Sequence, residues 1–478
     1  MTEPSPAAAP ATAAPRQTAR AKRLLNDPIL PTLLRLAAPN IVVMLAQAAA
    51  NFLESYYVGQ LGVPALAGAA LVVPLVMAMQ MLSAGAVGGA ISSAIARALG
   101  AGRHAEAEAL ALHATVIGIV FGVVLSVAML GLGPYIYRAL GGRDSTLAAA
   151  VTYSNAVFLG TTFLWLLNAF ASILRGTGNM LLPAAVVTGG VLVLVVASPV
   201  LIFGAGPIPP MGIAGAGLAL VCYYAVGFVV LLVALLRGYG GIRLSFAHRL
   251  RWSMFAEILG VGIYAAVNSL MINLSVITAT AMIGMHGPHA LAGFGLGIRL
   301  EYLLVPLIFG FGAGMVAMVG MNTGAGQHAR ARRVAWTGAL VAAGLCELIG
   351  LAAAIWPAAW LSLFTQDEEA IRMGAAYLRA VAPAYGLFGL GLALYFASQG
   401  ARRLGWSVIA AVSRVAVIGL LGYLTLTLWH GELGAFFAAL VLGLAIFAAV
   451  NAVPWVPTPP APLPDGEGSK PLASAPRR

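Results

Sequence analysis

The sequence predicts an all-α polytopic membrane protein with twelve transmembrane helices in two pseudo-symmetric six-helix bundles. Three observations support this fold class. The 478-residue chain is 61% hydrophobic and only 9% charged, which is too little charge to cover the surface of a soluble protein. Apolar runs of roughly 20 residues recur along it, each long enough to cross a bilayer. Finally, short motifs of the first half return in the second half.

The apolar runs are bounded by Gly, Pro or Arg, as membrane crossings often are. Six of them form the predicted N-terminal bundle, residues 28–236, at 35–58, 65–95, 112–133, 149–170, 182–203 and 213–236. A basic cytoplasmic linker is expected at 237–256. The other six form the predicted C-terminal bundle, residues 257–453, at 257–283, 290–320, 335–356, 375–398, 406–428 and 433–452.

The two ends of the chain, residues 1–27 and 454–478, are rich in Pro and Ala, which predicts disordered cytoplasmic tails. The first tail lacks the apolar core of a signal peptide. Most of the 26 Lys and Arg residues fall on the tails and on the loops of the same side. The positive-inside rule therefore places both termini in the cytoplasm. The net charge of +11 then reflects membrane topology, so lipid is an expected partner and nucleic acid is not.

An internal repeat relates the two halves. YVGQLGVPALAG at 57–68 aligns without gaps on MIGMHGPHALAG at 282–293, an offset of 225 with six of twelve positions identical. LGAGRHAEA at 99–107 matches TGAGQHARA at 323–331 after a shift of one residue. Because six helices is an even number, the halves share one orientation and a two-fold axis along the membrane normal. Substrate sites of such transporters lie near the interface of the repeats.

One face of the first predicted helix carries polar side chains and one Met at steps of four, three, four and three residues: Asn40, Met44, Gln47, Asn51 and Glu54. A face toward lipid has no use for this stripe, so we expect it to line the path of a transported solute. The further candidates for this path are Tyr57, Gln80, Asn268 and Asn273. For Gln47 and Asn51, hydrogen bonding between helices is an equal alternative, and for Asn268 and Asn273 it is the favoured one.

Glu54 is the candidate ion-coupling residue. It precedes Gly59 by five residues, which places it roughly 7 Å inside the end of its helix at 1.5 Å per residue. The hypothesis is that this carboxylate loads and unloads a proton during transport. The alternative is a glutamate that reaches out to the lipid headgroups.

Four other charged residues lie within predicted spans, and we expect structural roles for them: Arg299, Glu301, Glu347 and Arg414. Arg299 and Glu301 are two residues apart, so they point to different sides of their helix and need separate partners. A lone charge at mid-membrane costs about 2.5–3.5 kcal/mol on insertion scales. The depth of Glu347 matches that of Arg414, which predicts a pair between them.

Nothing in the sequence indicates an enzyme. Cys222 and Cys346 lie in apolar runs, and the seven histidines have no metal-ligand spacing. The spans hold no catalytic constellation, and the glycine-rich loops lack the Lys-Ser/Thr of a phosphate-binding loop. We therefore expect no metal and no cofactor beyond a coupling ion, H⁺ or Na⁺. A receptor-like sensor is disfavoured by the two-fold repeat.

Several motifs together resemble the multidrug and toxic compound extrusion (MATE) family. They are FLESYYVGQLG (52–62), LGAGRHAEA, LRGTGNMLLP (174–183), SPVLIFGAGPIPPMGIAGAGLAL (198–220), ALAGFGLGIRLEYL (290–303), TGAGQHARA and FASQGARRLG (396–405). The resemblance implies a monomer in the bacterial inner membrane that exports organic, often cationic, small molecules in exchange for H⁺ or Na⁺. Many members carry Asn and Asp where this chain has Leu194 and Ser198, which leaves Glu54 a larger share of ion coupling and disfavours Na⁺.

The expected function is therefore secondary active multidrug export by alternating access, with organic cations leaving the cell against inward H⁺. The alternative is a flippase of lipid-linked oligosaccharides or lipid precursors from the same wider superfamily. Such flippases line a deep cavity with several cationic residues, whereas here only Arg299 and Arg414 lie within spans.

Overall fold

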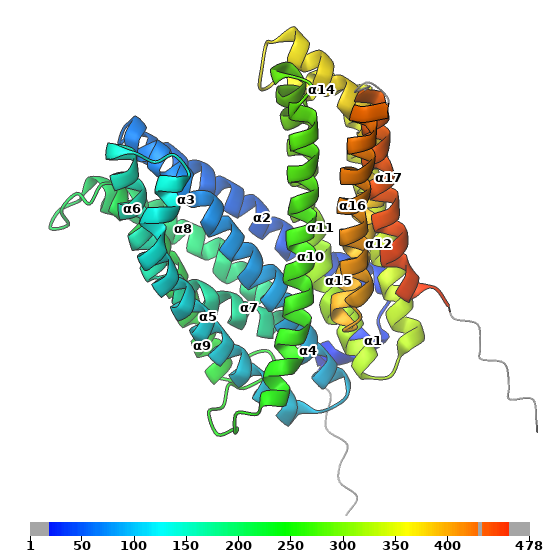
Figure 1. Cartoon of the computed structure of the whole chain (residues 1–478). Coiled ribbons are helices and arrows are strands. Elements are labelled where there is room, and N and C mark those ends of the chain that lie inside the picture. Colours follow the sequence, from blue (N-terminus) through cyan, green and yellow to red (C-terminus); the bar gives the residue numbers. More distant parts are fainter. Residues whose placement is uncertain (1–18, 429–432, 458–478) are drawn as a thin grey trace, which may run out of the picture.

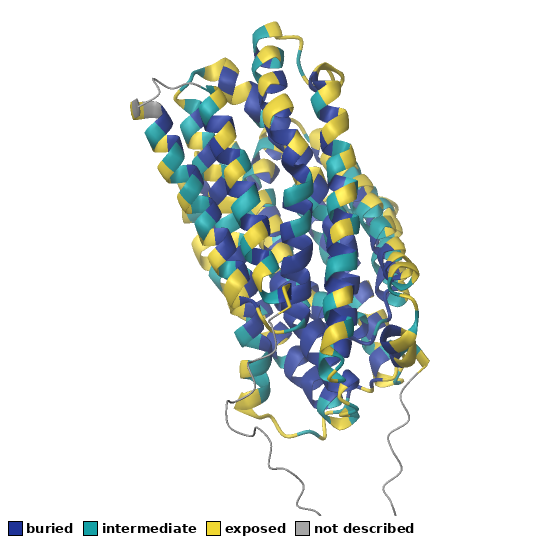
Figure 2. Cartoon of the chain, turned by 90° about the vertical axis from the view of Figure 1, so that its right-hand side faces the viewer, coloured by how far each residue is buried: buried dark blue, intermediate teal, exposed yellow. Residues whose placement is uncertain are grey.

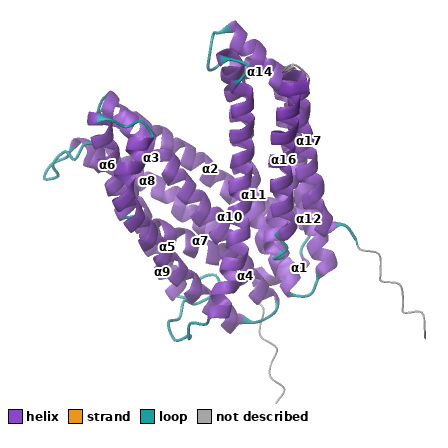
Figure 3. Ribbon diagram, in the orientation of Figure 1, coloured by secondary structure: helices purple, strands orange, loops and turns teal. Residues whose placement is uncertain are grey.

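Helices make up nearly all of the computed structural model, which describes residues 19–428 and 433–457 (Figure 1, Figure 3). Eleven of its helices are long and apolar enough to cross a membrane. A twelfth crossing is formed if α6 and α7, which are bent by 45° at Gly160, are one span. The predicted fold class is confirmed, and its fourth span is the bent one.

The first half of the chain forms one lobe, the N-lobe, on the left of Figure 1. Its elements are α2 (Ile29–Gly59), α3 (Val63–Gln80), the π-helix η1 (Met81–Val87), α4 (Gly88–Gly100), α5 (His104–Ala139), α6 (Asp144–Leu159), α7 (Thr161–Gly176), α8 (Leu181–Phe203) and α9 (Ile213–Leu236). Pro39 lies within α2 and Pro74 within α3, and neither proline interrupts its α-helix. The chain instead departs from α-helical geometry after α3, at η1. Such π-turns are common at functional sites.

The second half forms the C-lobe. Its elements are α10 (Trp252–Gly284), α11 (Pro288–Gly324), α12 (His328–Ile355), α13 (Pro357–Leu361), α14 (Glu368–Val381), the 3₁₀-turn η2 (Ala382–Ala384), α15 (Tyr385–Gly400), α16 (Gly405–Leu428), α17 (Leu433–Ala452) and the 3₁₀-turn η3 (Val453–Trp455). The linker is shorter than predicted, because α10 already begins at Trp252. His430 lies outside the described residues.

The helix boundaries reproduce the sequence repeat. The ends of α2 and α10, at 59 and 284, and the starts of α3 and α11, at 63 and 288, share an offset of 225 in residue number. The offset is already 224 where α4 and α11 end, at 100 and 324, and it stays 224 for the next four pairs of helices, which start at 104 and 328, 144 and 368, 161 and 385, and 181 and 405. The last pair, α9 and α17, starts at 213 and 433, an offset of 220. These offsets define equivalent positions in the two lobes.

The lobes meet at one end of the molecule, here called the joined end, and diverge toward the other, the divergent end (Figure 1). Buried residues gather along the middle of the molecule and at the joined end (Figure 2). There α4 crosses α11 with no room for a side chain. A Cβ on Gly100 would overlap the carbonyl oxygen of Met321, and one on Gly324 would overlap that of Arg97. The two contacts are equivalent under the offset of 224, so they lie across the pseudo-two-fold axis.

Polar contacts reinforce the joined end. The Arg97 guanidinium on α4 pairs with the Glu257 carboxylate on α10 at 3.0 Å. The Ser93 hydroxyl donates to the carbonyl oxygens of Gln399 and Gly400, at 2.6 and 3.0 Å. The Gln399 amide donates in return to the carbonyl oxygen of Gly85 at 3.2 Å. Most of these acceptors are backbone carbonyl oxygens, so side chains of one lobe bind directly to the backbone of the other.

A short helix, α1 (Ala19–Asn26), bridges both lobes at the joined end. The predicted disordered tail through residue 27 is therefore too long. The Asn322 amide on α11 donates to the carbonyl oxygen of Leu24 at 3.1 Å. The Leu24 side chain also lies against Gly178 of the N-lobe, where a Cβ would overlap it. Burial of Leu24 and Leu25 on one side of α1 explains why this stretch folds onto the bundle.

Candidate functional site

Glu54 lies in a hydrogen-bonded cluster inside the N-lobe. The hydroxyl of Tyr153, on α6, donates to Glu54 Oε1 at 2.5 Å. Tyr153 is fully buried between helices, at 2% exposure, so its hydroxyl needs a polar partner there. Glu54 is five residues from the end of α2, and the bond turns its carboxylate toward protein. The alternative of a glutamate reaching out to the headgroups does not describe this geometry.

Further polar groups, from α3, α9 and α2 itself, complete this N-lobe cluster. The Gln80 amide, at the end of α3 where η1 begins, donates to the Tyr224 hydroxyl on α9 at 3.0 Å. Tyr224 is also within electrostatic reach of Glu54. The neighbouring ring of Tyr223 lies 5.0 Å from that of Tyr224, and its hydroxyl is hydrogen-bonded to Gln47 of α2. The cluster thus joins α2, α3, α6 and α9.

The Glu54 carboxylate has no ion-pair partner within residues 19–428 and 433–457. The hydroxyls around it are neutral at physiological pH. Burying a carboxylate without a fixed counter-charge is costly, so the group gains by binding a proton or a cationic solute. The cluster therefore offers a single negative charge that one proton or one cation could neutralise.

The other residues predicted to line the solute path differ in how far they are exposed. Asn40 is buried, and its amide donates to the carbonyl oxygen of Gly310 on α11 at 3.2 Å, so it joins the lobes instead of facing solute. Asn268 is also fully buried. Both amides are thus covered by protein in this conformation, and their place on the solute path stays a prediction. Asn51 and Asn273 are exposed, and Met44 and Tyr57 are half-buried.

The charged residues within the spans have other partners than predicted. Arg414 on α16 pairs with Glu301 on α11 at 2.9 Å, so the predicted pair with Glu347 is wrong. Glu347 instead accepts from the backbone N–H of Gly386 at 2.8 Å. Pro383 interrupts the helix just before this point and frees that donor, which the carboxylate then satisfies. The Arg299 guanidinium lies 5.3 Å from the centre of the Phe364 ring.

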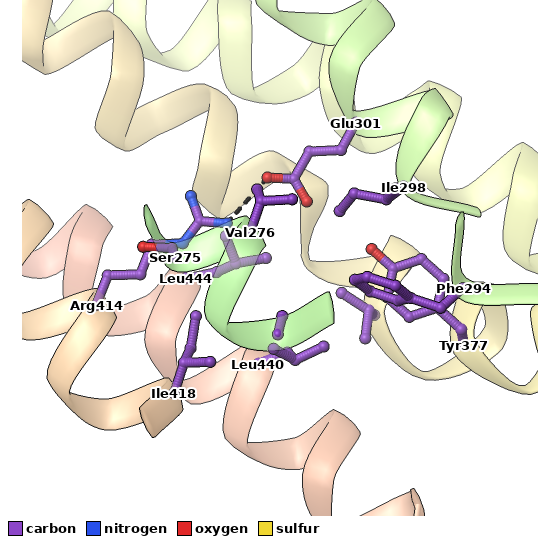
Figure 4. A pocket seen from close by; sticks show the side chains of 12 residues that line it. Ser275, Val276, Phe294, Ile298, Glu301, Tyr377, Arg414, Ile418, Leu440 and Leu444 are labelled. Carbon is purple, nitrogen blue, oxygen red and sulfur yellow. Dashed lines mark hydrogen bonds and ion pairs between the residues drawn. The ribbon is translucent and has the colours of Figure 1, made fainter. Parts of the chain in front are cut away.

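The Glu301–Arg414 pair borders a small cavity inside the C-lobe (Figure 4). Ser275, Tyr377 and Phe294 line it as well. The cavity has a volume of about 20 Å³, which is enough for a water molecule. The cavity is far too small for a drug-sized ligand, which needs a few hundred Å³. No group of three or more His, Cys, Asp or Glu side chains in the described part of the chain could hold a metal ion.

Sequence reasoning missed the tyrosines of the N-lobe cluster and the ion pair of the joined end. Tyr153 is far from Glu54 in the sequence, and nothing local marks it as a partner. The repeat held one signal, because Tyr153 at the offset of 224 gives Tyr377, a second buried tyrosine. Arg97 and Glu257 each lie near the end of a span on the same side of the membrane. Pairing opposite charges at such span ends could have suggested their contact.

The sequence matches the model of the MatE family over residues 39–200 and 265–424, more than half of the chain. A curated relative, the FAD transporter of Shewanella oneidensis, is 25% identical over 383 residues, which are 78% of this chain and 82% of that protein. The probable multidrug resistance protein YoeA of Bacillus subtilis is 24% identical over 64% of this chain and 69% of its own length.

Solved structures share the fold. A MOP superfamily transporter from Pyrococcus furiosus, described as having a binding pocket of reverse polarity, superposes with a TM-score of 0.80 at 21% identity, covering 92% of this chain and 98% of its own. A multidrug resistance MATE family transporter in an outward-facing conformation gives a TM-score of 0.79 at 21% identity, with the same coverage. A MATE crystal structure in a bent conformation gives 0.81 at 22% identity, covering 92% and 97%.

Proposed function

The chain belongs to the MATE family of transporters, and from this we propose that it is a secondary active exporter of organic cations, driven by inward H⁺. It would work as a monomer in the bacterial inner membrane, without ATP, metal or other cofactor, and would catalyse no covalent chemistry. Small organic molecules and membrane lipid are its expected partners.

The observation that carries this proposal is the uncompensated Glu54 carboxylate. It is held by the Tyr153 hydroxyl and has no fixed cation beside it in the described part of the chain. A proton and an organic cation would compete for it, and competition for one negative charge is the simplest form of antiport. The coupling would be strict, because each positive charge has to leave before the other binds.

H⁺ is favoured over Na⁺ by the composition of the N-lobe cluster. Its one carboxylate is Glu54, and the other groups are tyrosine hydroxyls and side-chain amides. On α8, Leu194 and Ser198 are buried in the lobe and add no second carboxylate. A proton needs only one acceptor oxygen, whereas a bare metal cation needs several oxygen ligands to replace its water.

The arrangement of the lobes suits alternating access. The positive-inside assignment would place the joined end in the cytoplasm, so the lobes would diverge toward the outside. This conformation would be the one that releases cargo and receives protons. Separation of α4 from α11, and closure of the divergent end, would then produce the opposite state.

A second candidate cargo is a flavin nucleotide, because the Shewanella oneidensis FAD transporter matches over 82% of its length. The uncompensated carboxylate of the N-lobe disfavours an anionic cargo there. A lipid-linked oligosaccharide flippase remains the alternative function. Its polyanionic cargo calls for free cationic side chains, whereas Arg414 is engaged by Glu301 and Arg299 lies over Phe364.

Export from proteoliposomes tests this proposal. Vesicles loaded with a fluorescent organic cation, or with FAD, would receive a proton gradient or a sodium gradient separately. We expect the proton gradient alone to drive cation movement, and a protonophore to abolish it. Protein-free vesicles provide the control. Transport of FAD but not of the cation, or drive by sodium alone, would contradict the proposal and favour the corresponding alternative.

A further inference from the structure

The small cavity in the C-lobe occupies the same place in its lobe as the Glu54 cluster does in the N-lobe. Two of its lining residues are Ala279 and Tyr377, and Tyr377 is labelled in Figure 4. Ala279 corresponds to Glu54 at the offset of 225 that relates α2 to α10. Tyr377 corresponds to Tyr153 at the offset of 224 that relates α6 to α14. The tyrosine is thus present in both lobes, whereas the carboxylate of the first helix is replaced by a methyl group.

The C-lobe restores a carboxylate from a different helix. Glu301 on α11 borders the cavity, beside Tyr377 and Ser275. Its equivalent positions on α3 are Val76 and Met77, at offsets of 225 and 224, and neither carries a charge. Each lobe therefore holds one carboxylate at this site, a half-buried one from α2 in the N-lobe and a buried one from α11 in the C-lobe.

The arginine of the C-lobe fills a space that an aromatic ring fills in the N-lobe. Arg414 corresponds to Gly190 at the offset of 224, and a Cβ on Gly190 would overlap the ring of Tyr223. Tyr223 in turn corresponds to Gly443 at the offset of 220 that relates α9 to α17. A Cβ on Gly443 would lie 3.5 Å from Arg414 Cγ. In the N-lobe the glycine is on α8 and the large side chain on α9, whereas in the C-lobe the large side chain is on α16 and the glycine on α17. Gly443 therefore leaves room for Arg414.

The two sites differ in charge balance. In the C-lobe the side chains of Arg414 and Glu301 are only 5% and 7% exposed, and their 2.9 Å contact makes the site neutral. The guanidinium also lies 5.4 Å and 5.8 Å from the ring centres of Phe388 and Phe447, which hold it in place. Its Nε and Nη1 have no hydrogen-bond partner in the described structure, so the fit to Glu301 is its main polar contact.

We propose that Arg414 is a built-in counter-ion: its guanidinium stands where a proton or a small monovalent cation would otherwise bind to Glu301. The C-lobe site is a carboxylate site of the same kind as that of Glu54, closed to exchangeable cations by the chain itself. Loss of the guanidinium opens it, with Glu301, Ser275 and Tyr377 offering oxygen ligands. This inference concerns cation binding in the C-lobe and does not rest on the cargo or the coupling ion proposed above.

The surroundings of Glu301 make the inference testable by pH. The titratable groups that feel its charge are Tyr302, Tyr377 and Tyr385, besides Arg414. Tyrosines stay neutral up to about pH 10 and arginine stays charged, so none of them titrates between about pH 5 and pH 8. Without Arg414, a proton could neutralise the Glu301 carboxylate in place of the guanidinium, and protons are more available at the lower pH.

The experiment compares melting temperatures of the purified full chain at about pH 5 and pH 8. Each is measured in choline chloride and in sodium chloride of equal ionic strength. The variants are Arg414→Met and the double variant Glu301→Gln/Arg414→Met. Arg299→Met serves as the matched control, because Arg299 is also within a span but lies over Phe364, away from Glu301.

We expect Arg414→Met in choline chloride at the higher pH to melt roughly 5–15 °C below wild type, the usual cost of an unpaired buried charge. Acid or sodium should restore most of this loss. The double variant should melt near wild type under every condition, and neither wild type nor Arg299→Met should respond to sodium. If Arg414→Met yields no folded protein, recovery by the double variant supports the proposal.

Two results would overturn the inference. One is an Arg414→Met protein whose melting temperature responds to pH and sodium as wild type does. The other is a double variant no more stable than Arg414→Met, or equally unable to fold, since Arg414 would then act through packing and not through charge. Neither readout involves transport, so failure here is separate from failure of the proposed function.

Discussion

Proton-driven export is expected to fall to the level of protein-free vesicles in the Glu54→Gln variant. Glutamine keeps the size of the side chain, and its carbonyl oxygen can still accept the hydrogen bond from Tyr153, so the N-lobe cluster stays assembled. It can carry neither a proton to release nor a negative charge for a cationic cargo. The measurement is efflux of a fluorescent cation from proteoliposomes under an imposed pH gradient.

Glu347→Gln is the matched control for this experiment. Glu347 is a carboxylate within a span of the other lobe, and its contact is the backbone N–H of Gly386. Glutamine can accept the same hydrogen bond, so export by this variant should stay close to wild type. Export by Glu54→Gln at the wild-type rate, or equal loss in both variants, would remove Glu54 from its proposed role.

The second large effect is expected at the joined end, from Gly100→Ala and Gly324→Ala. A single methyl group at either position would overlap a backbone carbonyl oxygen, of Met321 or of Arg97. Backbone cannot move aside as a flexible side chain can, so we expect each variant to lose about 1–3 kcal/mol of the contact between α4 and α11. Conformations that separate the lobes at this end would gain population. The accessibility of a cysteine introduced at this interface to a membrane-impermeant thiol reagent measures the shift.

Gly131→Ala provides the control for the glycine pair. Gly131 lies in α5, and a Cβ there would meet nothing within 4 Å. In an exposed helix position this change favours the helix by about 0.5–1 kcal/mol. Thiol accessibility at the joined end should therefore be unchanged in Gly131→Ala and raised in Gly100→Ala and Gly324→Ala. Equal accessibility in all three would show that the close crossing does not hold the lobes together.

The sequence was sufficient for most of the fold. Bilayer-length apolar runs predicted the helices, and the shift of one residue between the repeats anticipated the change of offset from 225 to 224. Hydropathy could not show the bend at Gly160, since the two arms together form one apolar stretch of spanning length. It also missed α1, whose fold depends on burial of Leu24 and Leu25 against distant parts of the chain.

The candidate site was predictable in part. An acidic residue in an apolar run identified Glu54, because such a residue needs a reason to be there. Depth alone suggested Glu347 as the partner of Arg414, but the rotation of each helix about its axis decides which groups meet, and packing sets that rotation. Glu301 therefore pairs with Arg414, while Glu347 binds a backbone group that residue type does not reveal.

The bridge formed by α1 has a consequence for the timing of the transport cycle. This peptide contacts Asn322 on one side and Gly178 on the other, so the lobes cannot part at the joined end while both contacts last. If the lobes separate at this end during transport, α1 has to detach from one of them first, and the frequency of this local opening would limit the turnover rate.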